Sequence, residues 1–129
     1  MFGRKTRNTI DSLIGTATTI EGNVHFNGGM RIDGVVKGNV IATGDDLSML
    51  VISEHARIEG EVRVAHLVIN GEILGAVFSS ELLELQPKAR ITGDVQYKAL
   101  EMQGGAVVSG KLTHSVASEP VLQLAMSNT

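Results

Sequence analysis

Ile58-Glu-Gly-Glu-Val-Arg-Val64 is the stretch that decides the fold class of this 129-residue chain. Its apolar residues and its glycine occupy every second position, and charged residues stand between them. A repeat of two is the pattern of a β-strand with one buried face, whereas a helix repeats every three to four residues. The stretch therefore predicts short strands joined by a tight corner at Gly60, where no side chain keeps the backbone away from the axis.

The same pattern recurs along most of the chain. The unit apolar-x-Gly-x-apolar begins at Ile20, Ile32, Ile58, Ile69, Ile91 and Val108. A second unit, two apolar residues around one position, begins at Met30, Leu50, Leu67, Leu83 and Leu100. From Leu50 onward, these starts are 17, 16 and 17 residues apart, a spacing typical of one solenoid coil per repeat.

Strands this short bury their apolar faces by winding into a β-helix, in which each strand pairs in parallel with its equivalent one coil away. We expect an all-β chain with about six coils, a β-helix at 18–113 and disordered tails at 1–17 and 114–129. The inward ladders are predicted to be Leu50, Leu67, Leu83, Leu100 and Ile52, Ile69, Leu85, Met102. Each buried member contributes roughly 1.5 to 3 kcal/mol, so a polar residue at Ile69 or Leu85 is expected to cost the fold.

Composition excludes several functional classes. The net charge of −3 gives no basic field for nucleic acid, and 3% aromatic residues give no stacking platform for bases. The chain has no cysteine, so it has neither a disulfide framework nor a thiolate metal site. No stretch approaches the 18 consecutive apolar residues of a membrane-spanning helix.

Three longer strings resemble a known family, the bactofilins, which are bacterial polymer-forming cytoskeletal proteins. The strings are 50–62, 81–95 and 99–112, within a match that covers about Ile14 to His114. The resemblance implies a right-handed, three-faced β-helix that assembles end to end into non-polar filaments without nucleotide. It also implies a cytoplasmic scaffold, partly at the inner membrane, that positions cell-envelope or peptidoglycan enzymes.

The two ends of the solenoid are the candidate polymerisation surfaces, because a terminal coil exposes unpaired backbone groups and one side of the apolar core. The predicted residues are Ile20, Val24 and Phe26 at the amino-terminal end and Ala106, Val108 and Leu112 at the carboxyl-terminal end. Solenoids that stay monomeric cover such ends with a capping segment. Tails folded over the ends are the alternative to self-assembly.

The first residues are a candidate membrane-targeting peptide, consisting of Met1, Phe2, Arg4 and Lys5. An apolar pair followed by basic residues inserts shallowly and holds anionic headgroups. It is similar to the short targeting peptide at the start of many bactofilins. One copy binds weakly, so we expect membrane binding to depend on the avidity of an assembled filament. An ordinary solvated terminus is the alternative.

The remaining polar residues suggest no chemistry. The charged residues Glu59, Glu61, Arg63, Glu84, Lys88, Arg90 and Asp94 are expected on the outer faces of the coils. The histidines are His25, His55, His66 and His114, and the 11 residues between His55 and His66 are not a whole coil. We therefore expect no catalytic residue, metal or cofactor.

Two other functions fit a β-helix less well. A hexapeptide-repeat acyltransferase or a γ-type carbonic anhydrase keeps a strict six-residue period, which the spacing of Gly34 to Gly38 and of Gly60 to Gly71 breaks. A discrete, soluble oligomeric adaptor would show a fixed mass independent of concentration. The sequence favours a structural polymer whose main partner is a second copy of itself.

Overall fold

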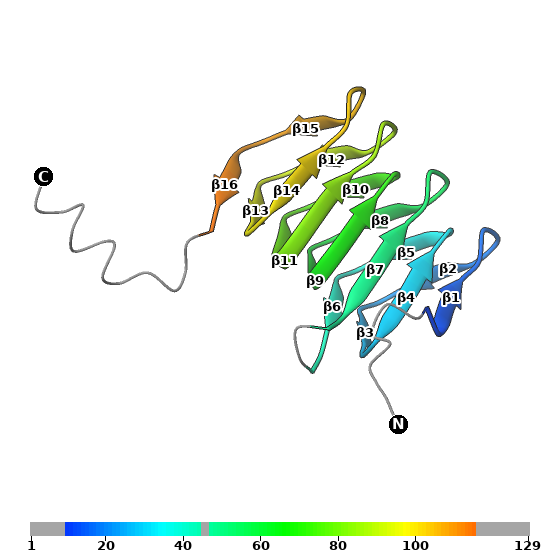
Figure 1. Ribbon diagram of the computed structural model, residues 1–129. Helices are drawn as coiled ribbons and strands as arrows, with labels where there is room; N and C mark the ends of the chain where they lie inside the picture. The colour runs from blue at the N-terminus through cyan, green and yellow to red at the C-terminus, as the bar shows by residue number, and fades with distance from the viewer. Residues whose placement is uncertain (1–9, 45–46, 116–129) are drawn as a thin grey trace, which may run out of the picture.

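The computed structural model describes residues 10–44 and 47–115, and this part of the chain consists of short strands joined by turns, bends and irregular residues, without a helix (Figure 1). None of these residues forms a helix long and apolar enough to cross a membrane. Every strand pair is parallel. The prediction of an all-β parallel solenoid is therefore confirmed.

The strands lie on three faces. Face 1 holds β1 (Ser12–Ile14), β4 (Gly29–Ile32), β7 (Met49–Ile52), the second half of β9 (Val62–Ile69), the second half of β11 (Val77–Leu85) and β14 (Leu100–Met102). Face 2 holds β2 (Thr19–Glu21), β5 (Val35–Lys37), β8 (Arg57–Glu59), β10 (Glu72–Leu74), β12 (Arg90–Thr92) and β15 (Val107–Ser109). Face 3 holds β3 (Val24–Phe26), β6 (Val40–Ala42), the first halves of β9 and β11, β13 (Val95–Tyr97) and β16 (Leu112–His114). Figure 1 shows β4, β7, β9, β11 and β14 side by side on face 1.

The strand register defines six coils. One column of paired residues runs through Ser12, Met30, Leu50, Leu67, Leu83 and Leu100. Successive members are 18, 20, 17, 16 and 17 residues apart. The predicted second ladder is also present, because Ile52, Ile69, Leu85 and Met102 are successive partners. The long strands β9 and β11 continue around the corner between faces 3 and 1.

The core is the stack of inward side chains. Ile32, Ile52, Ile69 and Leu85 are all 0% exposed, as are Val40, Val62, Val77 and Val95 on face 3. Along a strand, buried positions alternate with partly exposed ones, as in β7. This confirms that the two-residue pattern sets the inside and outside of every coil.

The glycines of the repeat serve two different corners, a distinction that the single sequence unit did not predict. The corner between faces 2 and 3 carries one glycine in every coil, namely Gly22, Gly38, Gly60, Gly75, Gly93 and Gly110. Gly34 and Gly71 instead lie at the corner between faces 1 and 2. A Cβ at Gly71 would meet the carbonyl oxygens of Ser53 and Ala56 at 2.2 and 2.8 Å, in the longer turn of the preceding coil.

The solenoid begins earlier than predicted. β1 starts at Ser12, inside the segment 1–17 that we expected to be a tail, and the Asp33 N–H donates to the Ile14 carbonyl at 2.7 Å. A strand of three residues with one inward apolar side chain has too little pattern to be recognised alone, and pairing with β4 defines it. The last strand ends at His114, while residues 1–9 and 116–129 lie outside the described part.

Candidate assembly surfaces at the two ends

The amino-terminal end is formed by β1, β2 and β3, each of which has a strand partner on one side only among the described residues. Of the predicted residues, Ile20 and Val24 are half-buried at this end, and Phe26 is 7% exposed. Ile14, at 8% exposure, joins them as the first member of its inward ladder. The sequence analysis missed Ile14, although it precedes Ile32 in register.

The carboxyl-terminal end is formed by β14, β15 and β16 and is more open. Of the predicted residues, Ala106 and Val108 are half-buried against the core, and Leu112 is 41% exposed. Leu100 and Met102 complete this end. The sequence analysis predicted both residues as members of the inward ladders but did not include them in the end surface. Each is the last member of its ladder, and this position was the signal that could have identified it.

The exposure of this end follows from the missing next coil. Leu112 is the partner of Val95, which is 0% exposed, and Met102 is the partner of Leu85, which is also 0% exposed. Leu112 and Met102 themselves are 41% and 46% exposed. The same inward positions thus change from buried to exposed where stacking ends, which leaves strand edges and apolar side chains available for another chain.

No described strand covers β14, β15 and β16 on their outer side. The segments that could fold over the ends, 1–9 and 116–129, are outside the described ranges. So are the predicted membrane-targeting residues Met1, Phe2, Arg4 and Lys5.

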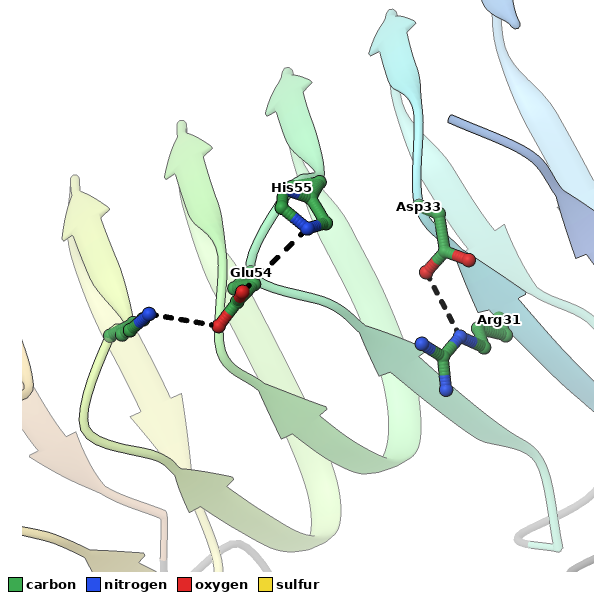
Figure 2. A network of polar contacts seen from close by, with 5 residues as sticks. Arg31, Asp33, Glu54 and His55 are labelled. Carbon is green, nitrogen blue, oxygen red and sulfur yellow. Dashed lines mark hydrogen bonds and ion pairs between the residues drawn. The ribbon is translucent and has the colours of Figure 1, made fainter. Parts of the chain in front are cut away.

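Ion pairs run along the outer surface. On face 2, Arg57 contacts Glu59 and Glu72 at 2.9 and 2.7 Å, and this guanidinium holds the pKa of the Glu59 carboxyl below its usual value. At the corner between faces 1 and 2, Figure 2 shows the Arg31–Asp33 pair and the Glu54–His55 pair on successive coils. The predicted charged residues of the outer faces are all exposed or half-buried, which confirms that alternation placed them outside.

The histidines are spread over the molecule. His25, His55 and His114 are exposed, and His66 is half-buried on face 1. The described ranges contain no group of three or more His, Asp or Glu residues that could hold a metal ion. His114 instead lies beside the Tyr97 ring, with 5.6 Å between ring centroids.

Among the described residues, the terminal coils of this parallel β-solenoid each keep one strand edge without a partner, an arrangement that fits the class of solenoid proteins that associate through their ends. Comparison with known proteins agrees with this class. Residues 12–113 match the family model of the bactofilins, described as polymer-forming cytoskeletal proteins, and the chain therefore belongs to the bactofilin family. The resemblance seen in the sequence is thereby confirmed.

Two relatives are informative. The chain is 23% identical over 111 residues to bactofilin BacO of Myxococcus xanthus (strain DK1622), with 86% of this chain and 85% of the relative aligned. Its fold matches a cryo-EM structure of Thermus thermophilus bactofilin double helical filaments with a TM-score of 0.73 and 30% identity. That match covers 81% of this chain and 99% of the other.

Proposed function

We propose that this chain assembles end to end through its terminal coils into filaments that need no nucleotide. The observation that carries the proposal is the contrast between Leu112 and its inner partner Val95, because a further coil stacked on this end would bury Leu112 as Val95 is buried. Covering an apolar side chain contributes up to roughly 1.5 to 3 kcal/mol. Each new backbone hydrogen bond along three strand edges adds about 0.5 to 1.5 kcal/mol.

The first test is electron microscopy of the purified protein without nucleotide or metal, beside the variant Leu112→Arg. The matched control is Thr113→Arg, since Thr113 is the exposed neighbour on the same strand. We expect the wild type and the control to form filaments. We expect Leu112→Arg to form none, while its circular dichroism spectrum shows that the β fold is unchanged. Long filaments from a folded Leu112→Arg chain would contradict the proposal, and a fixed oligomer mass at every concentration would favour a discrete adaptor.

We further propose that the filament is non-polar, with like ends in contact, because each such contact is isologous and the apolar carboxyl-terminal end can cover itself. Analytical ultracentrifugation of the two end variants tests the polarity. In a non-polar filament, Leu112→Arg leaves dimers joined through the amino-terminal ends, and Val24→Arg leaves dimers joined through the carboxyl-terminal ends. Monomers of 13.7 kDa from both folded variants would instead indicate head-to-tail contacts.

Pairing of two filaments side by side is part of the proposal. The structurally similar T. thermophilus protein forms double helical filaments, and the 30% identity supports the same for this chain. The width of wild-type filaments in electron micrographs measures it, because a pair is twice as wide as a single filament.

Membrane association is proposed through the amino-terminal peptide Met1, Phe2, Arg4 and Lys5. Each basic residue near an anionic surface contributes about 1 kcal/mol, so a filament with many copies gains the avidity that one chain lacks. In a flotation assay with vesicles containing anionic lipid, we expect filaments to float and both a chain lacking residues 1–5 and Leu112→Arg to remain below. Flotation of Leu112→Arg equal to that of wild type would contradict the avidity argument.

The cellular role we propose is that of a cytoplasmic scaffold at the inner membrane that positions cell-envelope or peptidoglycan enzymes. Membership in a polymer-forming cytoskeletal family supports this role. The test is the position of a fluorescently tagged cell-wall enzyme in cells that carry wild-type protein or Leu112→Arg. An unchanged enzyme position with the filaments lost would contradict the scaffold role.

A further inference from the structure

The outer surface of face 1 differs from that of the other two faces. In the third to fifth coils, its outward side chains are almost all uncharged and half-buried: Met49, Val51, His66, Val68 and Leu82. We call Met49, Val51, Val68 and Leu82 the apolar patch. Strand alternation explains why they point outward, since their neighbours Leu50, Leu67 and Leu83 are at most 1% exposed and form the core.

The same coils carry charge on face 2. There Arg57 pairs with Glu59 and Glu72, and Arg90 follows in register. On face 3, Arg63 covers the Phe78 ring, with its guanidinium carbon 3.9 Å from the ring centroid. Face 1 is therefore the one side of the described solenoid whose middle coils present adjacent apolar residues with no ion pair among them.

The charges that flank the apolar patch differ in sign. Arg31 lies on one side, in the second coil, and is exposed. Glu84 and Glu101 lie on the other side, in the fifth and sixth coils. Arg31, Glu84 and Glu101 belong to the same outward column of paired residues as Val51 and Val68. The Nε of Arg31 bonds Asp33 at 2.9 Å at the corner, and the Arg31 side chain remains 50% exposed.

We propose that face 1 is the surface through which two filaments of this chain pair, and that the solenoid axes of two facing chains run antiparallel. The inference deepens the proposed function and rests on it. The two copies are related by a twofold axis that runs along the strand direction between the third and fourth coils. This axis places the third coil of one copy opposite the fourth coil of the other, and the second coil opposite the fifth. Val51 of one copy then faces Val68 of the other, and Arg31 faces Glu84.

The remaining outward positions agree with this register. The same axis sets Leu82 of one copy opposite Gly29 of the other, so neither side of this contact carries a charge. Met49 is set opposite His66. A parallel pairing would instead bring Arg31 against Arg31 and Glu84 against Glu84, and such like charges oppose association.

The size of the face explains why the contact belongs to filaments rather than to single chains. Six coils spaced about 4.8 Å apart, with strands of about four residues, give a face of roughly 29 by 13 Å. This is on the order of half of the 800 Å² per partner that a stable interface buries. Repetition along a filament supplies the missing affinity through avidity.

Charge-swap variants test the contact in electron micrographs of filaments. Arg31→Glu and Glu84→Arg each place like charges opposite one another in the antiparallel register, so each is expected to give single filaments of normal length. The double variant restores opposite charges and is expected to restore pairing, a rescue that a purely structural role of either residue would not produce. Arg90→Glu on face 2 is the matched control and should leave filaments paired.

The apolar patch is tested separately by Val68→Lys, with Leu74→Lys on face 2 as its control, because both residues are half-buried and outward. We expect a tenfold or greater loss of paired filaments from the first variant and no loss from the second. Circular dichroism confirms that each variant folds.

The outcomes separate this inference from the proposed function. If the wild-type chain forms no filaments, the proposed function fails, and the pairing of filaments through face 1 fails with it. If wild-type filaments are single, or if both charge variants stay paired, or if the folded double variant stays single, the pairing surface is wrong while end-to-end assembly stands. If Val68→Lys filaments remain paired but no longer float with lipid vesicles, face 1 contacts the membrane and the inference is overturned.

Discussion

The stacked glycines at the corner between faces 2 and 3 give the sharpest test of the fold. Gly75 has φ of +154°, and a Cβ there would lie 2.2 Å from the Gly60 carbonyl oxygen and 2.6 Å from its carbon. Gly22, in the first coil, has φ of +134° but no atom within 4 Å of such a Cβ. Gly104 has neither a crowded site nor a positive φ. These three positions separate backbone strain from coil-to-coil contact.

The expected losses of unfolding free energy follow from these environments. An L-residue in a backbone region reserved for glycine costs about 1 to 3 kcal/mol, and forcing a methyl group into a packed site costs typically 1 to 3 kcal/mol more. Gly75→Ala is thus expected to lose about 4 kcal/mol and Gly22→Ala about 2 kcal/mol. Gly104→Ala should stay within about 0.5 kcal/mol of the parent.

Urea unfolding followed by β circular dichroism measures these losses. All three variants are made in a double-variant background, Val24→Arg with Leu112→Arg, because Leu112→Arg alone still leaves dimers in a non-polar assembly and assembly would add to the apparent stability. If Gly75→Ala is as stable as Gly104→Ala, the coils do not approach as closely as this corner requires. If Gly75→Ala only equals Gly22→Ala, backbone conformation alone selects glycine and the contact argument is refuted.

Three further outcomes follow from the core, a buried corner and the surface charges. Ile69→Ala, at a position 0% exposed, is expected to lose about 2 to 5 kcal/mol in urea unfolding. Ser48→Ala should lose about 1 to 3 kcal/mol in the same assay, because Ser48 is 2% exposed and its Oγ accepts the Ala65 N–H at 3.1 Å. A contact with Lys88 lowers the pKa of the Glu54 carboxyl in the folded state below 4.5, and a contact with Arg57 does the same for Glu59. The two ionised carboxylates therefore stabilise the fold above pH 4.5, and this stabilisation is lost as the pH falls through the lowered pKa values. Melting temperatures should therefore be flat from about pH 7 to 5 and decline below about pH 4, less steeply in the double variant Glu54→Gln and Glu59→Gln.

The inward ladders show which parts of the fold the local sequence pattern can predict. Leu50, Leu67 and Leu83 were predicted as stacked neighbours because a coil has an almost constant length and an inward residue must meet another inward residue. The start at Ser12 escaped prediction, since one inward residue, Ile14, carries no periodicity. Pairing between distant segments, here β1 with β4, is what makes that strand.

The candidate ends were predicted in part. Leu112 and Val24 followed from being the last and first members of one inward column, and an exposed apolar side was expected at both ends. The sequence did not predict that the two ends differ, with Leu112 41% exposed and Val24 half-buried. The same inward position is 0% exposed at Val95 and 41% exposed at Leu112, and the sequence pattern around the two is alike. The number of coils stacked on each side decides the difference.

The sequence by itself determined the strand alternation, the coil length and the parallel stacking, because each depends on neighbours a few residues apart or on a repeat that can be counted. The tertiary structure alone decided which glycines share a corner, since Gly34 and Gly60 stand in the same sequence unit but lie against different backbone atoms of the preceding coil. It also decided that uncharged outward residues from three coils meet on face 1. Such a surface exists only when winding brings residues 16 to 20 positions apart to about 4.8 Å.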